Sequence, residues 1–140
     1  MSASLTRVVG FTAHHRYFRP EWTPAQNHAA FGACAEAPGH AHDYLCAVTV
    51  AGSPHPVTGM IMDLAVLDRI LAEQVTGPLH GKHFNLDVAE FAYGKVIPTC
   101  EAVAEYLYGR IAPSLPVGVR LARIRIQEDA TLYADSTGPA

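Results

Sequence analysis

Charged residues and cysteines are both scarce in this chain, and each shortage excludes a class of protein. Of the 140 residues, 16% are charged, and the formal net charge is −3. This balance leaves no basic stripe that could follow a phosphate backbone, so we expect no nucleic-acid partner. The three cysteines have no paired spacing, which argues against a disulfide framework and predicts reduced thiols.

Long hydrophobic runs are absent as well. No apolar segment approaches the roughly 20 residues that a membrane helix needs, and the N-terminal "MSASLTRVVGF" lacks the charged start and apolar centre of a secretory signal. We therefore expect a cytoplasmic protein without a membrane partner. Hydrophobic residues make up 49% of the chain, enough for one core, so a single domain over residues 1–140 is expected.

Two segments in the first half of the chain have the composition of strands. Residues 7–18, "RVVGFTAHHRYF", mix β-branched, aromatic and polar types. Residues 40–52, "HAHDYLCAVTVAG", alternate, and because side chains repeat every second residue along a strand, His40 and His42 point the same way. The three prolines and two glycines of residues 19–39 predict a long irregular connection between the strands.

The second half of the chain predicts two helices and a final strand. Residues 62–75 carry a leucine stripe at helical spacing, with Asp63 placed to cap the first turn. Residues 98–112 also carry apolar residues at helical spacing, with Thr99 placed as the cap. Residues 116–134 read as a near-alternating strand, with a break that could make a hairpin. The order of elements predicts an α+β domain, an antiparallel sheet with helices on one face.

Histidine is the unusually frequent residue, with eight in the chain. Two imidazoles at i and i+2 on a strand can bind one ion, and a third nitrogen from a neighbouring strand would leave a fourth position open, as in catalytic zinc sites. The plain alternative is that His40 and His42 are exposed polar residues at a strand start. His14 or His15 could supply the third nitrogen, and periodicity does not say which of them points inward.

Five motifs carry a family resemblance over most of the chain. They are "FTAHHRY", "NHAAFGACAEAPGHAHDY", "PVTGMIMDL", "PTCEAVAEYL" and "IRIQED", in order from about residue 11 to about residue 133. Together they resemble the successive signatures of the 6-pyruvoyltetrahydropterin synthase family, which includes the bacterial 6-carboxytetrahydropterin synthases. The resemblance implies a tunnelling fold: a four-stranded antiparallel sheet with two helices on one face. It also implies subunits joined into trimeric barrels, usually stacked as homohexamers, with the active site between subunits.

The resemblance also assigns roles to single residues. It implies that His15, His40 and His42 hold zinc and that Cys34 is the catalytic proton acceptor. A thiol acts as a base only as thiolate, so Cys34 needs a nearby cation or a polar site that lowers its pKa.

Three further residues are implied to bind the substrate. Glu128 matches the glutamate that anchors the pterin through paired hydrogen bonds, for which a carboxylate has two suitable acceptors. Thr99 and Glu101 match residues that line the pocket. A helix cap and a first-turn acid would account for Thr99 and Glu101 without any ligand.

One motif departs from the family. Its members carry an Asp-His pair that acts as a second acid/base relay beside the cysteine, whereas the stretch here is "LHGKHFNLD". Aligning His83 with the family histidine places Lys82 where the aspartate belongs. The other register puts His80 in the aspartate position and Gly81 in the histidine position. We prefer the first because "HFNLD" keeps the pattern that follows, and in both registers the aspartate is missing.

The lost aspartate changes the expected chemistry. An aspartate raises the pKa of its imidazole, and an adjacent ammonium would lower that of His83, the predicted proton donor. Lys82 could favour the Cys34 thiolate, bind a substrate anion, or act as an amine nucleophile toward a carbonyl. The alternative is that Lys82 is a solvated loop lysine and that Asp87 or another acid takes the place of the missing aspartate.

Three hypotheses about function follow. The leading one is a zinc-dependent lyase that converts 7,8-dihydroneopterin triphosphate to a pyruvoyl or carboxy tetrahydropterin. The second is a repurposed homologue in secondary metabolism, which catalyses an amine-aldehyde condensation or cyclisation of the Pictet-Spengler type in the same zinc pocket. The third is an inactive pterin-binding or scaffolding homologue, because fold does not guarantee function.

Overall fold

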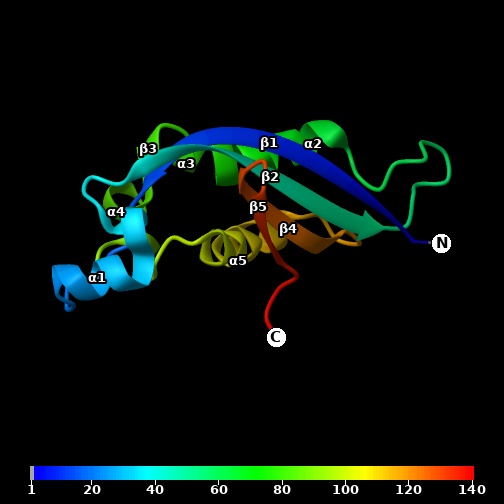
Figure 1. The fold of residues 1–140 in the computed structure, drawn as a ribbon. Coiled ribbons are helices and arrows are strands. Elements are labelled where there is room, and N and C mark those ends of the chain that lie inside the picture. Colours follow the sequence, from blue (N-terminus) through cyan, green and yellow to red (C-terminus); the bar gives the residue numbers. More distant parts are fainter. Residues whose placement is uncertain (1) are drawn as a thin grey trace.

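The computed structural model describes residues 2–140, which form one sheet and a set of helices along it (Figure 1). The strands are β1 (Ala3–His15), β2 (His40–Gly52), β3 (Lys82–His83), β4 (Arg120–Asp129) and β5 (Leu132–Ser136). The α-helices are α1 (Pro24–Phe31), α2 (Leu64–Leu71), α3 (Gly77–Leu79), α4 (Phe84–Asp87) and α5 (Cys100–Ile111). A π-helical turn, Ala72–Thr76, joins α2 to α3, and short 3₁₀ turns follow α1, α4 and α5.

The sheet is mixed and five-stranded, so the expected four-stranded antiparallel sheet is wrong. Its strand order is β3-β1-β2-β4-β5. The pairs β1-β2, β2-β4 and β4-β5 are antiparallel, whereas β3 lies parallel to β1 and pairs with it at Ala13 and His14. A two-residue strand has no side-chain periodicity, so its sequence pattern did not reveal it. The expected break in the last strand is confirmed as the turn between β4 and β5.

The connection between β1 and β2 is more ordered than its prolines suggested. It contains α1, in which Thr23 accepts a hydrogen bond from the backbone of Gln26, the Gln26 side chain binds back to Thr23, and Pro24 occupies the first turn. The expectation of an irregular connection is therefore wrong for these residues. The helix has no apolar stripe, and Asn27 is its one buried residue. A capping box is the signal that predicts such a helix.

The core lies on one face of the sheet, which α2 and α5 cover. Along β2 the side chains of Tyr44, Cys46 and Val48 are buried, while Leu45 between them is 44% exposed. They pack with Leu67 of α2, Leu107 of α5 and their neighbours in one hydrophobic cluster. The expectation of helices on one face is confirmed, as are the caps Asp63 and Thr99. The prediction of two helices was too low, because α1, α3 and α4 also form.

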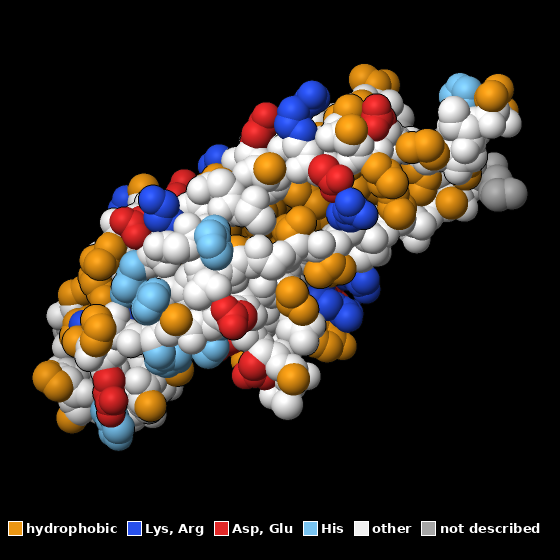
Figure 2. Space-filling model, turned by 90° about the horizontal axis from the view of Figure 1, so that it is seen from above, with side chains coloured by type: hydrophobic (Ala, Val, Ile, Leu, Met, Phe, Trp, Pro, Cys, Tyr) orange, Lys and Arg blue, Asp and Glu red, His pale blue; other side chains and the backbone are white. Residues whose placement is uncertain are grey.

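The opposite face of the sheet is open. Val8 of β1 is 53% exposed there. In Figure 2, most of the visible histidines lie toward one end of the surface seen from above, and hydrophobic side chains are visible at both ends. Among residues 2–140, no helix is long and apolar enough to cross a membrane.

Candidate metal centre and active site

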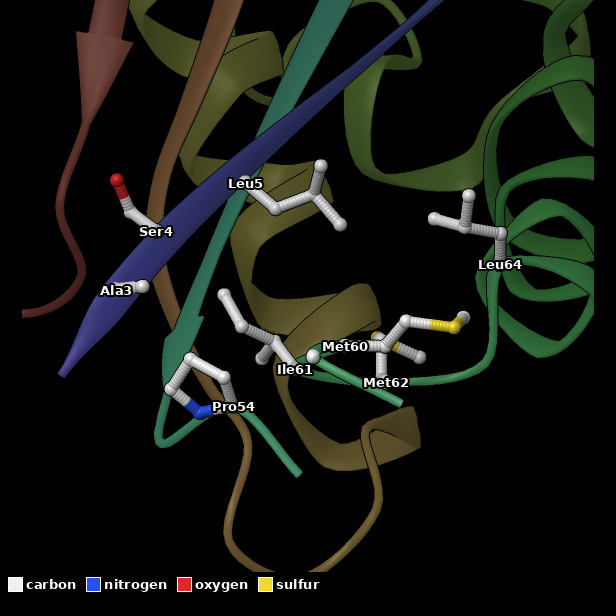
Figure 3. A pocket seen from close by; sticks show the side chains of 9 residues that line it. Ala3, Ser4, Leu5, Pro54, Met60, Ile61, Met62 and Leu64 are labelled. Atoms are coloured by element: carbon white, nitrogen blue, oxygen red, sulfur yellow. The ribbon is translucent and has the colours of Figure 1, made fainter. Parts of the chain in front are cut away.

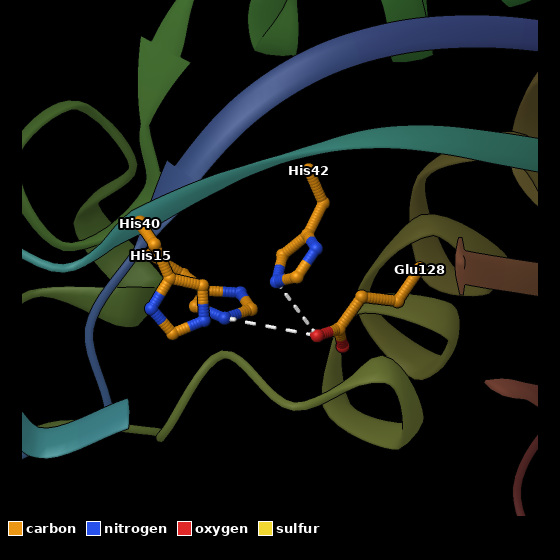
Figure 4. A group of neighbouring side chains, drawn as sticks. All are labelled: His15, His40, His42 and Glu128. Atoms are coloured by element: carbon orange, nitrogen blue, oxygen red, sulfur yellow. Dashed lines mark ion pairs between the residues drawn. The ribbon is translucent and has the colours of Figure 1, made fainter. Parts of the chain in front are cut away.

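Four side chains from three strands converge at the polar end of the core face (Figure 4). They are His15 of β1, His40 and His42 of β2 and Glu128 of β4, and one ligand atom from each lies within 4.8 Å of the others. Imidazole nitrogens and carboxylate oxygens are the ligands that zinc and related divalent ions take in proteins.

Strand register explains why the three histidines meet. His15 lies opposite His40 in the β1-β2 pair, and Ala13 lies opposite His42. His40 and His42 continue the buried face of β2, as their two-residue spacing predicted. The choice that periodicity left open is also resolved, because His15 is fully buried on the cluster's face and His14 is exposed on the other.

Glu128 reaches the cluster from β4, where it lies on the same face as the buried Ile124 and Ile126, because side chains repeat every second residue along a strand. The β4-β5 register shifts between Gln127 and Asp129, so Glu128 has no partner on β5. The Glu128 side chain is 10% exposed, and its Oε1 atom lies 2.8 Å from Nε2 of His42 and 4.0 Å from Nε2 of His15.

The hydrogen bonding of the cluster is incomplete in a way that suits a cation. Nε2 of His15 and Nε2 of His42 are buried without a hydrogen-bond partner; the 2.8 Å approach of His42 to Glu128 is a close polar contact without hydrogen-bond geometry. Burial and the neighbouring His42 and His40 lower the pKa of His15 to about 3. A neutral imidazole keeps a lone pair for a metal, so the residues fit a divalent ion.

Cys34 lies beside this cluster. Its Sγ atom is 3.9 Å from Nε2 of His40, and its carbonyl accepts a hydrogen bond of 2.9 Å from the N–H of Tyr17. The side chain is half-buried at the 3₁₀ turn that follows α1. Burial and the charge of Glu128 raise the pKa of the Cys34 thiol above its ordinary value in the metal-free chain.

The start of α5 approaches Glu128 from the other side. Sγ of Cys100 donates to Oε2 of Glu128 at 3.2 Å, and burial with this contact raises the pKa of Cys100 to about 12. Thr99 caps α5 by accepting from the N–H of Ala102 at 3.1 Å. Glu101 is exposed in the first turn, and its charge adds to the raised pKa of Cys100.

Within one chain, His83 and Lys82 do not join the cluster. His83 pairs with His14 across the β1-β3 ladder, and their rings stack at 6.2 Å on the face opposite His15. Nε2 of His83 lies 2.8 Å from the carbonyl of Pro38. Lys82 is exposed.

Asp87 does not replace the missing aspartate at the imidazole. Its carboxylate accepts from the backbone N–H of His83 at 2.8 Å, and the ring nitrogen Nδ1 accepts from Asn85 at 3.2 Å. The imidazole of His83 is therefore oriented by backbone groups, with Pro38 on its other nitrogen. His80 also lies away from the cluster, because its Nδ1 accepts from the N–H of Thr12 at 3.1 Å.

Two neighbours of the cluster had no assigned role in the sequence. The Tyr44 hydroxyl lies 2.6 Å from Nδ1 of His15, and Cys100 holds Glu128. Tyr44 was detectable in part, since it follows His40 and His42 on the same face of β2. No spacing rule could have joined Cys100 to Glu128, which are 28 residues apart.

The apolar pocket drawn in Figure 3 lies at the other end of β1. Its volume is about 260 Å³, and it is lined by Leu5, Met60, Met62, Leu64 and their neighbours. Leu5 is ten positions before His15 along the strand, roughly 33 Å at the rise of a β-strand. This pocket is therefore separate from the candidate metal centre.

Comparison with known proteins identifies the protein family of this chain. Residues 4–139 match the family described as 6-pyruvoyl tetrahydropterin synthase, and the chain belongs to that family. It is similar to the 6-pyruvoyl tetrahydrobiopterin synthases of Homo sapiens and Pongo abelii, each 37% identical over 126 residues, which cover 90% of this chain and 85% of either relative. The resemblance read from the five motifs is confirmed.

Solved structures agree with this assignment. The chain superposes on the 6-pyruvoyl tetrahydropterin synthase of Caenorhabditis elegans with a TM-score of 0.91 and 27% identity, over 99% of this chain and 97% of that one. The Plasmodium falciparum 6-pyruvoyl tetrahydropterin synthase has a TM-score of 0.65 at 14% identity, over 96% of each chain, and shares the fold. The relatives are named synthases, which supports an enzyme of this type.

Proposed function

We propose that the chain is a zinc-dependent lyase that acts on 7,8-dihydroneopterin triphosphate and gives a 6-pyruvoyl or 6-carboxy tetrahydropterin. The observation that carries the proposal is the convergence of His15, His40, His42 and Glu128 within 4.8 Å, with the Cys34 thiol 3.9 Å from His40. Membership of the family supports the substrate class.

The three imidazoles are the proposed zinc ligands. A catalytic zinc keeps one position open for substrate, and a bound carboxylate would close it. We therefore assign His15, His40 and His42 to the metal and leave Glu128 to anchor the pterin. When bound, zinc supplies Lewis acidity to the side-chain oxygens of the substrate.

Cys34 is the proposed proton acceptor. Since burial and Glu128 raise the pKa of its thiol in the metal-free chain, the thiolate needs a cation close by at neutral pH. The neighbouring histidine cluster is the place for one. The contact between Tyr17 and the Cys34 carbonyl fixes the backbone that carries the thiol.

Cys100 orients the carboxylate of Glu128 for its proposed role as the pterin anchor. The Cys100 thiol donates to Oε2, which leaves Oε1 directed toward the histidines. We propose that Thr99 and Glu101, which begin the same helix, line the pterin pocket beside it.

Oligomerisation is part of the proposal, because the catalytic set is incomplete in one chain. His83 lies with His14 on the face opposite the cluster, so we propose that His83, with Lys82, enters the site of a neighbouring copy. The sheet has unpaired edges that suit such an assembly. Among the described residues, β1 has a strand partner on its outer side only at Ala13 and His14, and β5 is the other edge.

The condensation hypothesis drew its support from the altered "GKHFNLD" motif, in which Lys82 could act as an amine nucleophile. Such a lysine is activated by desolvation or a neighbouring cation, and the Lys82 side chain is exposed. No contact among residues 2–140 favours that reaction over the lyase.

Turnover of the zinc-loaded protein tests the proposal. Incubation with 7,8-dihydroneopterin triphosphate is expected to release inorganic triphosphate, and chromatography is expected to detect a tetrahydropterin product. Acetaldehyde release would indicate the 6-carboxy product. The variant Cys34→Ala is expected to lose about 10²- to 10⁴-fold in kcat, the usual contribution of a general base, and to keep its zinc.

A matched pair of histidine variants separates the metal site from general effects. His40→Ala is expected to lose both zinc and activity, whereas His55→Ala, on the exposed loop after β2, is expected to keep both. Full activity in Cys34→Ala, or no zinc in purified wild-type protein, would contradict the proposal.

A further inference from the structure

Tyr44 is a buried tyrosine at the base of the histidine cluster. Its side chain is 1% exposed, and its hydroxyl lies 2.6 Å from Nδ1 of His15, which is fully buried. The ring stacks on Phe11 at 5.0 Å and meets Phe84 edge-on at 5.8 Å. Two aromatic neighbours thus hold the ring, and the direction of the hydroxyl follows from their packing.

We propose that Tyr44 is a positioning residue that accepts the Nδ1 hydrogen of His15 and so presents the Nε2 lone pair of His15 to the metal. This inference rests on the proposed zinc site and deepens it, because it names the group that selects the ligating nitrogen. Tyr44 touches neither substrate nor metal in this role.

The directions of the two ring nitrogens support the proposal. Nδ1 of His15 faces Tyr44, while Nε2 has no hydrogen-bond partner and lies 4.0 Å from Oε1 of Glu128 on the cluster side. A neutral imidazole carries one hydrogen, so a hydrogen on Nδ1 leaves Nε2 free to bind a metal. A phenol oxygen can accept that hydrogen, and such outer partners fix the tautomer and orientation of ligand histidines.

Burial explains why His15 needs a protein partner. His40 and His42 are only half-buried. His15 has no exposed surface, and without Tyr44 its Nδ1–H would be a buried donor with nothing to bind, which is costly. Loss of the hydroxyl should therefore act on zinc affinity through His15.

The test compares two Tyr→Phe variants of the full chain. Tyr44→Phe removes the hydroxyl at His15 and keeps the ring that packs between Phe11 and Phe84. Tyr108→Phe is the matched control, because it also removes one hydroxyl hydrogen bond, the 2.9 Å contact to the carbonyl of Leu121, away from the cluster. Zinc affinity is measured by competition with a chromophoric chelator, and the site is monitored by the absorption bands of bound Co²⁺.

Tyr44→Phe is expected to weaken zinc binding by about 10- to 100-fold, the usual effect of losing an outer partner, and to alter the Co²⁺ bands. Tyr108→Phe is expected to match the wild type in both. Equal zinc affinity in Tyr44→Phe and wild type would overturn the inference and leave the proposed function intact. A wild-type protein that binds no zinc would overturn the proposed function itself.

A second measurement covers the case in which Tyr44→Phe does not fold. Wild-type protein with ¹⁵N-labelled histidine is loaded with zinc, and the proton on each ring nitrogen of His15 is located by NMR. A proton on Nδ1 and a metal-shifted Nε2 are expected. A metal-shifted Nδ1 or a proton on Nε2 would overturn the inference.

Discussion

Neighbouring residues give the same side-chain type different properties in this protein. His14 and His15 are adjacent in sequence, yet one is exposed beside His83 and the other is buried among two further imidazoles. Burial and the neighbouring His42 and His40 lower the pKa of His15 to about 3. Of two chemically identical rings, only His15 is placed to serve as a neutral metal ligand.

The three thiols allow a pH-dependent prediction at this scale. In metal-free protein, iodoacetamide is expected to modify Cys34 first, because Cys46 and Cys100 are buried. Burial and Glu128 raise the pKa of Cys34, so its rate should still be rising with pH beyond the ordinary thiol range. Burial raises the pKa of Cys46 and that of Cys100 to about 12, so both should stay unmodified up to about pH 9.

Peptide mass mapping of the modified protein measures this order. Cys34→Ala is the control and is expected to leave only slow labelling. Labelling of Cys100 as fast as Cys34 at pH 8 would contradict the burial that the structure shows.

Helix starts and short turns bring side chains from distant parts of the sequence to the site. The cap at Thr99 begins α5, which brings Cys100 to Glu128. The register shift beside Glu128 leaves that residue unpaired on β5, and α1 with its following turn places Cys34 beside β2. The start of α5 thus places Cys100 beside Glu128, and the turn after α1 places Cys34 beside His40.

Substitution of Thr99 separates its two possible roles. Thr99→Ala is expected to lower the free energy of unfolding by about 1 kcal/mol, since the N–H of Ala102 loses its acceptor. Thr99→Asn retains a cap and should keep wild-type stability in urea titrations. Since we place Thr99 in the pterin pocket, KM is expected to rise in both variants. An unchanged KM in Thr99→Asn would reduce Thr99 to a helix cap.

At the scale of the whole molecule, the sheet edges remain open. In β5, Leu132 is 49% exposed, and at the other edge β1 has strand pairing only near its end. Open strand edges pair readily with other chains. The apolar pocket at Leu5 and Met60 borders the open part of β1, which adds surface that a second copy could cover.

A charged edge is expected to weaken the proposed oligomer. Leu132→Lys places a lysine on β5, and charged edge residues oppose strand pairing. Light scattering after size-exclusion chromatography is expected to show smaller species than the wild type. Val57→Lys is the control, since Val57 is 86% exposed on the loop after β2 and should leave the mass unchanged. Identical masses for Leu132→Lys and wild type would argue against an edge-to-edge assembly through β5.

Much of the secondary structure followed from local patterns in the sequence. Alternation predicted β2 with both of its bounds, helical spacing predicted α2 and α5, and cap residues marked where those helices begin. These patterns work because side-chain direction within an element depends only on nearby residues. The helix in residues 19–39 and the strand β3 were missed, because α1 has no apolar stripe and β3 is too short for a period.

The residue types of the site were likewise determined by the sequence, and their arrangement was not. The His40-x-His42 spacing predicted two imidazoles on one face, and the resemblance pointed to His15, Cys34 and Glu128. The tertiary structure brought β1, β2 and β4 together at the cluster and buried His15 while leaving His14 exposed. It also turned His83 to the opposite face and set Tyr44 against Nδ1 of His15. Distances between strands depend on pairing register and packing across the whole chain, which a local pattern does not contain.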